Sequence, residues 1–137
     1  MVAIVDSNAV IAALDRGDPA HSQASVAISA ERATIVIPSA TLPEIAFLLS
    51  RRYGHLAAAE AIERVAAGPW KLEAIEPVDV RRAADLMRQY ADARLGFVDS
   101  AIVALAERLG TKRIYTLDRR DFSLVRPRHV AAFEILP

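Results

Sequence analysis

The stretch VAIVDSNAVIAAL, residues 2–14, decides the fold that the sequence predicts. Its first four residues form a short apolar and largely β-branched run without polar alternation, which is typical of a strand buried on both faces of a sheet. Asp6 follows this run directly, and the apolar pattern then predicts a helix over residues 7–14. A strand that leads straight into a helix favours a parallel sheet, because parallel neighbours need crossover connections.

Strand and helix signals alternate along the rest of the chain. Residues 34–37 and 113–117 resemble the first strand, and residues 71–75 and 132–136 are weaker strand candidates. Ser39 is the expected cap of a helix that reaches Tyr53, and the other expected helices cover residues 21–31, 55–67, 79–94 and 98–109. This order predicts a single-domain, three-layer α/β/α fold over residues 1–137, with a mostly parallel central sheet.

Composition narrows the class of protein. The chain has 137 residues, no cysteine and a hydrophobic fraction of 53%, which predicts one packed domain and excludes disorder, disulfides and zinc–thiolate sites. Asp6 and Asp15 interrupt the apolar N-terminal segment, so it is not a signal peptide. No apolar run approaches the roughly 18 residues of a membrane span. We therefore expect a cytoplasmic protein with no membrane contact.

The charged residues give a mixed indication about nucleic acid. The formal net charge is zero, which argues against a nucleic-acid-binding protein. However, only Lys71 and Lys112 are lysines, so the other 15 of the 17 basic residues are arginines, whose planar guanidinium suits bidentate phosphate contacts. His21, His55 and His129 show no metal-ligand spacing, and we expect them at the surface.

Four acidic residues occupy positions that favour a shared site. Asp6 and Asp118 directly follow two predicted strands, and ligand sites of parallel sheets lie beyond the carboxyl ends of the strands. Glu44 shares a predicted buried helix face with Phe47 and Leu48, and Asp99 shares one with other apolar residues. Neither acid has a basic residue three or four positions later. Since a buried carboxylate needs a partner or a metal ion, these acids are predicted to converge. Local roles in helix caps or turns remain open, and a cap residue can also be a metal ligand.

Converging carboxylates indicate a divalent cation. Two like charges about 5 Å apart repel by roughly 3 kcal/mol at an effective dielectric constant of 20. Oxygen ligands suit hard ions such as Mg²⁺, with Mn²⁺ as a substitute. A carboxylate–metal site of this kind favours phosphodiester hydrolysis by a metal-activated water.

Four segments in order resemble the PIN-domain nucleases, and more narrowly the VapC-type toxins of bacterial toxin–antitoxin pairs. They are IVDSNAVIAAL (4–14), PSATLPEIAFLLSRR (38–52), LGFVDSAIVALAERLG (95–110) and IYTLDRRDFSLV (114–125). Each segment alone is a weak signal, but all four in this order and spacing are a strong one. They contain Asp6, Glu44, Asp99 and Asp118 in turn.

The resemblance implies a Mg²⁺-dependent endoribonuclease whose catalytic and metal-binding residues are these four acids. Asp121 is an alternative or an addition to Asp118. The resemblance also implies an RNA substrate, inhibition by a cognate antitoxin, and a homodimer. The polar and basic residues beside the acids are candidate substrate contacts: Ser7, Thr116, Arg119 and Arg120.

Two other functions are alternatives to a metal-dependent nuclease. A phosphatase of the haloacid dehalogenase type would need a second acid two residues after its nucleophilic aspartate, and that position holds Asn8. A non-catalytic PIN-fold module that binds a protein partner would not need four intact acids. Both alternatives are therefore less favoured than the nuclease.

Overall fold

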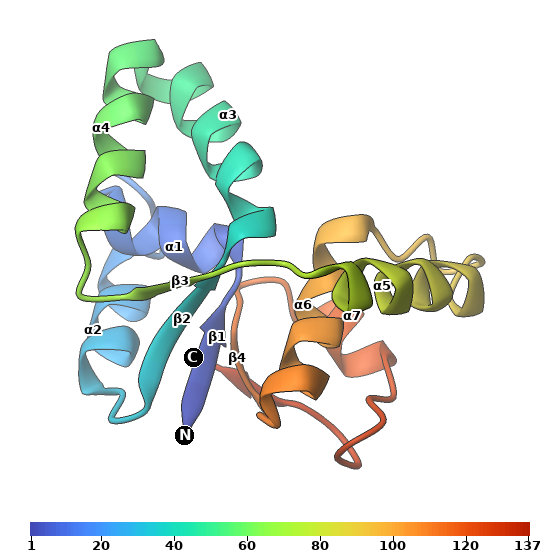
Figure 1. Ribbon diagram of the computed structural model, residues 1–137. Coiled ribbons are helices and arrows are strands. Elements are labelled where there is room, and N and C mark those ends of the chain that lie inside the picture. The colour runs from blue at the N-terminus through green and yellow to red at the C-terminus, as the bar shows by residue number, and fades with distance from the viewer.

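The computed structural model describes residues 1–137 and has a five-stranded parallel sheet at its centre (Figure 1). The strands are β1 (Val2–Val5), β2 (Thr34–Pro38), β3 (Lys71–Glu73), β4 (Arg113–Tyr115) and β5 (Glu134–Leu136). Their order across the sheet is β3-β2-β1-β4-β5, and every neighbouring pair is parallel. The strand order reverses at β1, which pairs with β2 on one side and β4 on the other. A ligand site is expected at the carboxyl end of that central strand.

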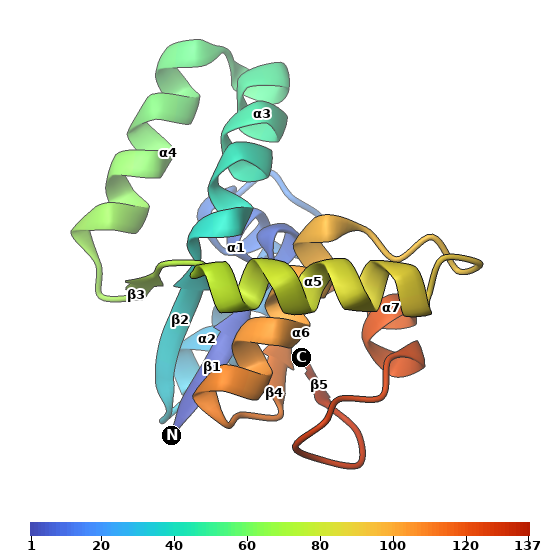
Figure 2. The ribbon, with the colours of Figure 1, turned by 45° about the vertical axis from the view of Figure 1, so that its right-hand side comes forward.

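Helices cover both faces of the sheet. The helical elements are α1 (Ser7–Leu14), α2 (His21–Ala30), a 3₁₀ turn η1 (Ser39–Thr41), α3 (Leu42–Tyr53), α4 (His55–Ala67), α5 (Pro77–Gln89), α6 (Phe97–Leu109) and α7 (Arg119–Leu124). Figures 1 and 2 show α3 and α4 as an antiparallel pair that projects beyond the strand ends, with α5, α6 and α7 on the opposite side of the molecule from α2. The predicted three-layer α/β/α architecture is confirmed.

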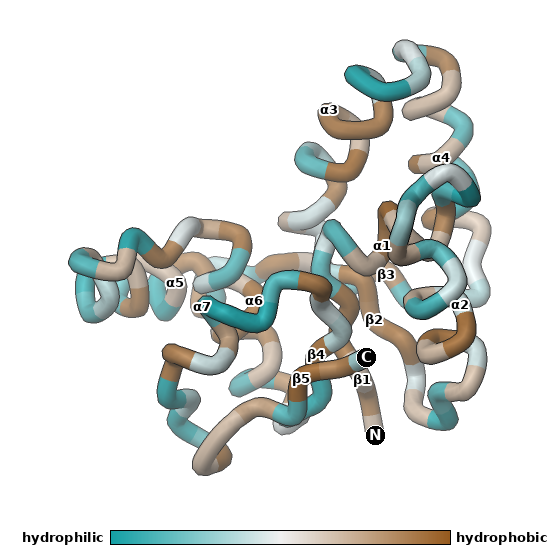
Figure 3. Tube along the Cα trace, turned by 180° about the vertical axis from the view of Figure 1, so that it is seen from behind, coloured by the Kyte–Doolittle hydropathy of each residue, from teal (hydrophilic) through white to brown (hydrophobic).

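The alternation of side chains along β1 separates two hydrophobic cores. Ala3 and Val5 pack with residues of α1, α3 and α4, whereas Ile4 packs with residues of α5, α6 and α7. Successive strand residues point to opposite faces of a sheet, so an unbroken apolar run fills both cores. In Figure 3 the hydrophobic stretches gather at the central strands, and the beginning of α7 is hydrophilic. No helix has both the length and the apolar character needed to cross a membrane.

Two predicted helix boundaries are wrong for local reasons. The helix expected from Ser39 begins with η1, and α3 starts at Leu42. Ser39 caps no helix, since its hydroxyl accepts a hydrogen bond from the Ile75 N–H (3.1 Å). The helix expected at residues 79–94 covers Pro77–Gln89, because Glu76 and Asp79 form a capping box and proline is tolerated in the first turn.

Two further expectations also need correction. Helix α7 was not predicted, since its six residues are too few for a periodic signal. His21 and His129 are partly buried, and their rings hydrogen-bond the carbonyl oxygens of Ala12 (2.7 Å) and Thr111 (2.6 Å). Of the three histidines, only His55 is exposed as expected.

Candidate active site

Asp6 lies at the carboxyl end of β1 and caps α1. Its Oδ1 accepts a hydrogen bond from the Ser7 N–H (2.7 Å), and its Oδ2 accepts one from the Thr116 hydroxyl (3.0 Å). The side chain is buried, with 4% of the residue exposed. Burial raises the pKa of Asp6, the two hydrogen bonds lower it in part, and the negative charge of Glu44 raises it further. The two hydrogen bonds therefore fix the Asp6 side chain at a position where burial and the charge of Glu44 disfavour its ionised form.

Thr116 and Asn8 join the beginning of α1 to the loop after β4. The Thr116 hydroxyl, which donates to Asp6, also accepts from the Asp118 N–H (3.1 Å). The side-chain oxygen of Asn8 accepts from the Leu117 N–H (3.0 Å). These contacts fix the segment that carries Asp118 relative to Asp6. The part played by Asn8 was missed from the sequence, because its partner Leu117 lies 109 positions away along the chain.

Glu44 reaches the site on an exposed helix face. The buried residues of α3 are Ile45 and Leu49, whereas Glu44 and Phe47 are exposed. The prediction that Glu44 shares a buried face with Phe47 and Leu48 is wrong, because Phe47 is apolar but faces outward. Glu44 nevertheless lines the same pocket as Asp6. Its presence there follows from the position of the first turn of α3 above the strand ends.

The C-terminal end of α3 is anchored to the loop between α1 and α2. Arg52 forms ion pairs with Asp15 (3.1 Å) and Asp18 (3.2 Å), and the Tyr53 hydroxyl donates to Asp15 (2.7 Å). These contacts hold the helix that carries Glu44 against the body of the protein. Arg52 is thus engaged in structure and is not free to contact a substrate.

Asp99 faces the pocket from the first turn of α6. Burial, a hydrogen bond shared with the Asp121 carboxyl, and the charges of Asp6, Asp121 and Asp118 raise the pKa of Asp99 from 3.8 to about 8. Asp118 is exposed and caps α7, accepting a hydrogen bond from the Arg120 N–H (3.2 Å). The cluster therefore holds more negative charge than its surroundings stabilise, and Asp121 lies against Asp99 without lining the pocket.

The four predicted acids line one open pocket of about 300 Å³. Its walls are formed by the strand ends and the first turns of three helices: Asp6, Ser7, Asn8, Glu44, Gly96, Phe97, Val98, Asp99 and Asp118. Of the candidate substrate contacts, Ser7 lines the pocket. Thr116 does not line it, but its hydroxyl donates a hydrogen bond to Asp6, which does. Arg119 instead donates hydrogen bonds to the carbonyl oxygens of Ile135 (3.2 Å) and Pro137 (3.3 Å), so it braces the C-terminal strand. The side chain of Arg120 is exposed outside the pocket.

The donor set fits a hard divalent cation. Every charged side chain in the pocket is a carboxylate, and the raised pKa values of Asp6 and Asp99 mark a charge excess that a cation would neutralise. No three acidic, histidine or cysteine side chains lie close enough to one another to ligate a single ion together. Mg²⁺ keeps several waters and binds through one or two carboxylates, so it does not require three ligands from the pocket.

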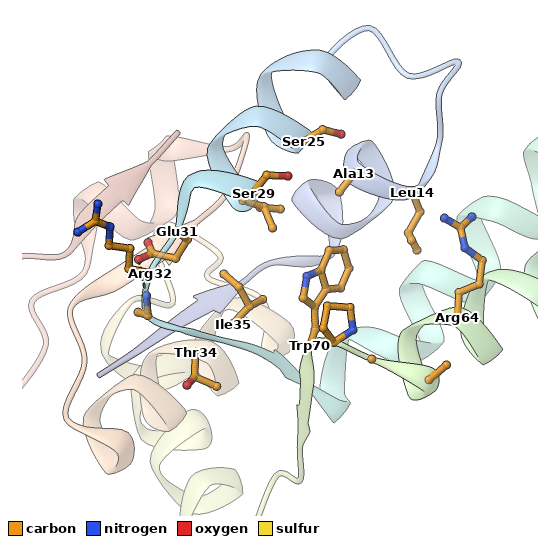
Figure 4. Close-up of a pocket in the computed structure, with 15 residues that line it drawn as sticks. Ala13, Leu14, Ser25, Ser29, Glu31, Arg32, Thr34, Ile35, Arg64 and Trp70 are labelled. Atoms are coloured by element: carbon orange, nitrogen blue, oxygen red, sulfur yellow. Dashed lines mark hydrogen bonds between the residues drawn. The ribbon is translucent and has the colours of Figure 1, made fainter.

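Larger hollows lie away from the acids. One of about 770 Å³ lies between α1, α2 and α4, where Trp70 and Ile35 face it (Figure 4). Its only carboxylate is Glu31, whose oxygen accepts hydrogen bonds from Tyr115 and Arg113 (2.6 Å each). This hollow therefore has no free acid for metal chemistry, and the smaller pocket is the candidate active site.

This fold, with acids gathered at the switch point of its sheet, is that of the PIN domain. Residues 3–126 match the sequence profile of that family, so the chain belongs to the PIN-domain proteins. Within this class, the chain is 33% identical to Ribonuclease VapC26 of Mycobacterium tuberculosis over 134 residues, which are 98% of this chain and 99% of that protein. The resemblance to VapC proteins is thereby confirmed.

Solved structures share the fold at lower sequence identity. The toxin VapC20 of Mycobacterium tuberculosis, described as cleaving the sarcin–ricin loop, has a TM-score of 0.79 and 22% identity over 88% of this chain and 92% of its own. A toxin–antitoxin complex from Klebsiella pneumoniae has a TM-score of 0.66 and 23% identity over 93% of this chain and 99% of its own. These likenesses confirm the architecture.

Proposed function

We propose that the protein is a metal-dependent endoribonuclease and acts as the toxin of a toxin–antitoxin pair. The observation that carries the proposal is the charge-crowded pocket in which Asp6, Glu44, Asp99 and Asp118 meet at the carboxyl ends of β1 and β4. Ribonuclease as the activity is supported by VapC26, the relative that aligns over nearly the whole chain. We also propose that residues 1–137 form a PIN-like nuclease domain.

Asp6 and Asp99 are the best-placed residues to hold Mg²⁺, because both are at least partly buried and their charges are the least stabilised. Glu44 and Asp118 are more exposed than Asp6 and Asp99. Their carboxylates would accept hydrogen bonds from the waters of the ion. A bound divalent ion supplies an activated water and stabilises the charge that develops on the phosphate. An ionised carboxylate of the pocket would serve as the general base, and the Ser7 and Asn8 side chains could donate hydrogen bonds to phosphate oxygens.

The direct test is cleavage of a labelled RNA by the purified protein with Mg²⁺, with Mn²⁺ and with EDTA. We expect cleavage with either metal, none with EDTA, and loss of activity in Asp6→Asn. Exposed Asp92, outside the pocket, provides the matched control Asp92→Asn, which should cleave normally. Equal cleavage by the Asp6→Asn variant would refute the proposal. Binding of a protein partner without any cleavage would favour the non-catalytic module instead.

The hollow of Figure 4 is our proposed place for the antitoxin. Its apolar floor includes Leu14, Ile35 and Trp70, and Arg32 and Arg64 also line it, which suits a segment with alternating apolar and acidic residues. The toxin–antitoxin complex of similar fold supports a partner of this kind.

A bulky side chain tests this placement. Ser29 is exposed and lines the hollow, so Ser29→Trp should block co-purification with the product of an adjacent antitoxin gene and leave RNA cleavage unchanged. Ser22→Trp, on the same helix but outside the hollow, is the control. Normal antitoxin binding by Ser29→Trp would refute the placement. A homodimer and a cytoplasmic location complete the proposal, and light scattering tests the first of these.

A further inference from the structure

Strand β4 brings Thr116 to the acids, but its hydrogen-bonded ladder is short. The Thr116 hydroxyl, one residue beyond the strand, donates to Asp6 (3.0 Å) and accepts from the Asp118 N–H (3.1 Å). β4 has three residues, of which two are in register with β1, and its other neighbour β5 is an equally short edge strand. Since each hydrogen bond adds little net stability, so short a ladder leaves the end of β4 dependent on side-chain contacts.

Glu31 supplies such a contact from the end of α2. Its Oε2 accepts hydrogen bonds from the Tyr115 hydroxyl and the Arg113 guanidinium (2.6 Å each), and its Oε1 accepts one from the Ala33 N–H (2.9 Å). Arg113 and Tyr115 are two residues apart, so their side chains project from the same face of β4. One carboxylate, whose side chain is only 5% exposed, therefore bonds both the first and the last residue of the strand.

The Tyr115 hydroxyl is the part of this anchor that bears on the acids. Tyr115 directly precedes Thr116 and is 3% exposed. Burial and the hydrogen bond to Glu31 raise the pKa of Tyr115 to about 12, so the hydroxyl stays protonated and donates. Glu31 lines the hollow of Figure 4 and not the acid pocket. The anchor of β4 thus lies outside the pocket that the end of the strand serves.

We propose that Tyr115, held by Glu31, is a positioning residue of the metal site: its hydroxyl fixes the end of β4 and so places Thr116 between Asp6 and Asp118. The inference rests on the proposed metal-dependent ribonuclease and adds to it a residue that touches neither metal nor substrate. If the contact served stability alone, removing the hydroxyl would lower Tm and leave the cation site unchanged.

The Mn²⁺ affinity of Tyr115→Phe, measured by electron paramagnetic resonance of the free ion, tests this role. Tyr90→Phe is the matched control, since the Tyr90 hydroxyl accepts a hydrogen bond from the Arg126 N–H (2.9 Å) and lies outside the pocket. Each substitution removes one hydroxyl and should lower Tm, and circular dichroism verifies that both variants are folded. Tyr115→Phe should weaken Mn²⁺ binding roughly 3- to 10-fold, less than the roughly 10- to 100-fold typical of a direct partner of a metal ligand. Tyr90→Phe should bind as wild type does.

A double substitution shows whether Tyr115 acts through Thr116. Thr116→Val removes the hydroxyl that bonds Asp6, so adding Tyr115→Phe should weaken Mn²⁺ binding little further, because the two residues act in series. Amide hydrogen exchange in EDTA gives a readout without metal. The Asp118 N–H, which donates to Thr116, should exchange faster in Tyr115→Phe and at the wild-type rate in Tyr90→Phe.

Unchanged Mn²⁺ affinity in Tyr115→Phe would overturn the proposal, and so would an equal loss of affinity with and without the Thr116 hydroxyl. Cleavage of labelled RNA separates this inference from the proposed function. Cleavage by wild type, together with unchanged Mn²⁺ affinity in Tyr115→Phe, would refute the positioning role and leave the ribonuclease standing. Mn²⁺ binding that depends on the Tyr115 hydroxyl, without cleavage by wild type, would refute the ribonuclease and leave the positioning role standing.

Discussion

Replacing Asp99 with asparagine should stabilise the metal-free protein at alkaline pH. Burial, the hydrogen bond with Asp121 and the neighbouring carboxylates raise the pKa of Asp99 from 3.8 to about 8. Because the folded pKa lies above the unfolded value, ionisation of Asp99 favours the unfolded chain. The penalty begins near pH 4, grows as the pH rises, and is complete above about pH 8. Asparagine has nearly the shape of the neutral carboxyl group and carries no charge at any pH.

The stabilisation expected from Asp99→Asn can be worked out from the shift in the pKa of Asp99. A pKa raised from 3.8 to about 8 corresponds to an upper limit of about 6 kcal/mol, at about 1.4 kcal/mol for each pKa unit. Asp121 shares the hydrogen bond, so part of this free energy belongs to the pair. We therefore expect Asp99→Asn to gain roughly 2 kcal/mol at pH 8.5. For a chain of this length, that gain raises Tm by roughly 6–10 °C.

Thermal melting followed by circular dichroism measures this gain. Wild type, Asp99→Asn and the exposed control Asp92→Asn are compared in EDTA at pH 5 and pH 8.5. The advantage of Asp99→Asn should be small at pH 5 and larger at pH 8.5, and Asp92→Asn should follow wild type. Added Mn²⁺ should raise the Tm of wild type more than that of Asp99→Asn. A Tm advantage of equal size at both pH values, or a loss at pH 8.5, would refute the charge-crowding argument.

Three other substitutions give separate tests. Glu44→Gln should leave Tm nearly unchanged, because Glu44 is exposed. The same variant should slow RNA cleavage roughly 10- to 100-fold through weaker metal binding, and unchanged initial rates would count against a role of Glu44 in the site. Thr116→Val removes a buried hydroxyl that bonds Asp6, so urea unfolding should show a loss of about 1–3 kcal/mol, and full stability would contradict that contact. Burial alone would raise the pKa of Glu31, but hydrogen bonds from Tyr115, Ala33 and Arg113 lower it to about 2. Its stabilising effect is therefore present above pH 4.5 and is lost as the pH falls towards 2, so Glu31→Gln should be destabilised at pH 7 and much less at pH 3; an equal loss at both would refute the linkage.

Topology made the positions of two acids predictable. Asp6 and Asp118 follow strands that pair in parallel, and the carboxyl ends of parallel strands meet at one edge of the sheet. Recognising the run at residues 2–5 as a strand was therefore enough to place Asp6. The same logic placed Asp118 in the loop after β4, although the structure adds its role as the cap of α7.

Features set by tertiary packing could not be predicted in the same way. Apolar spacing suggested a buried face for Glu44, but Phe47 is exposed, and a sequence pattern does not show whether an apolar side chain packs inward or serves a binding surface. Asn8 binds the Leu117 N–H across 109 positions of the chain. A contact of that separation leaves no local signal. Arg119 was a candidate substrate contact for its charge alone, and its carbonyl partners in the C-terminal segment are visible only in the fold.

The central claim is that Asp6 and Asp99 hold a hydrated divalent cation in this pocket, and Mn²⁺ binding measures it most directly. Electron paramagnetic resonance measures the concentration of free Mn²⁺ while the protein is titrated with the metal at neutral pH. We predict saturable binding by wild type and by Asp92→Asn, and strongly weakened binding by Asp6→Asn and Asp99→Asn. Binding that is equally strong in Asp6→Asn, or no saturable binding by wild type, would contradict the account.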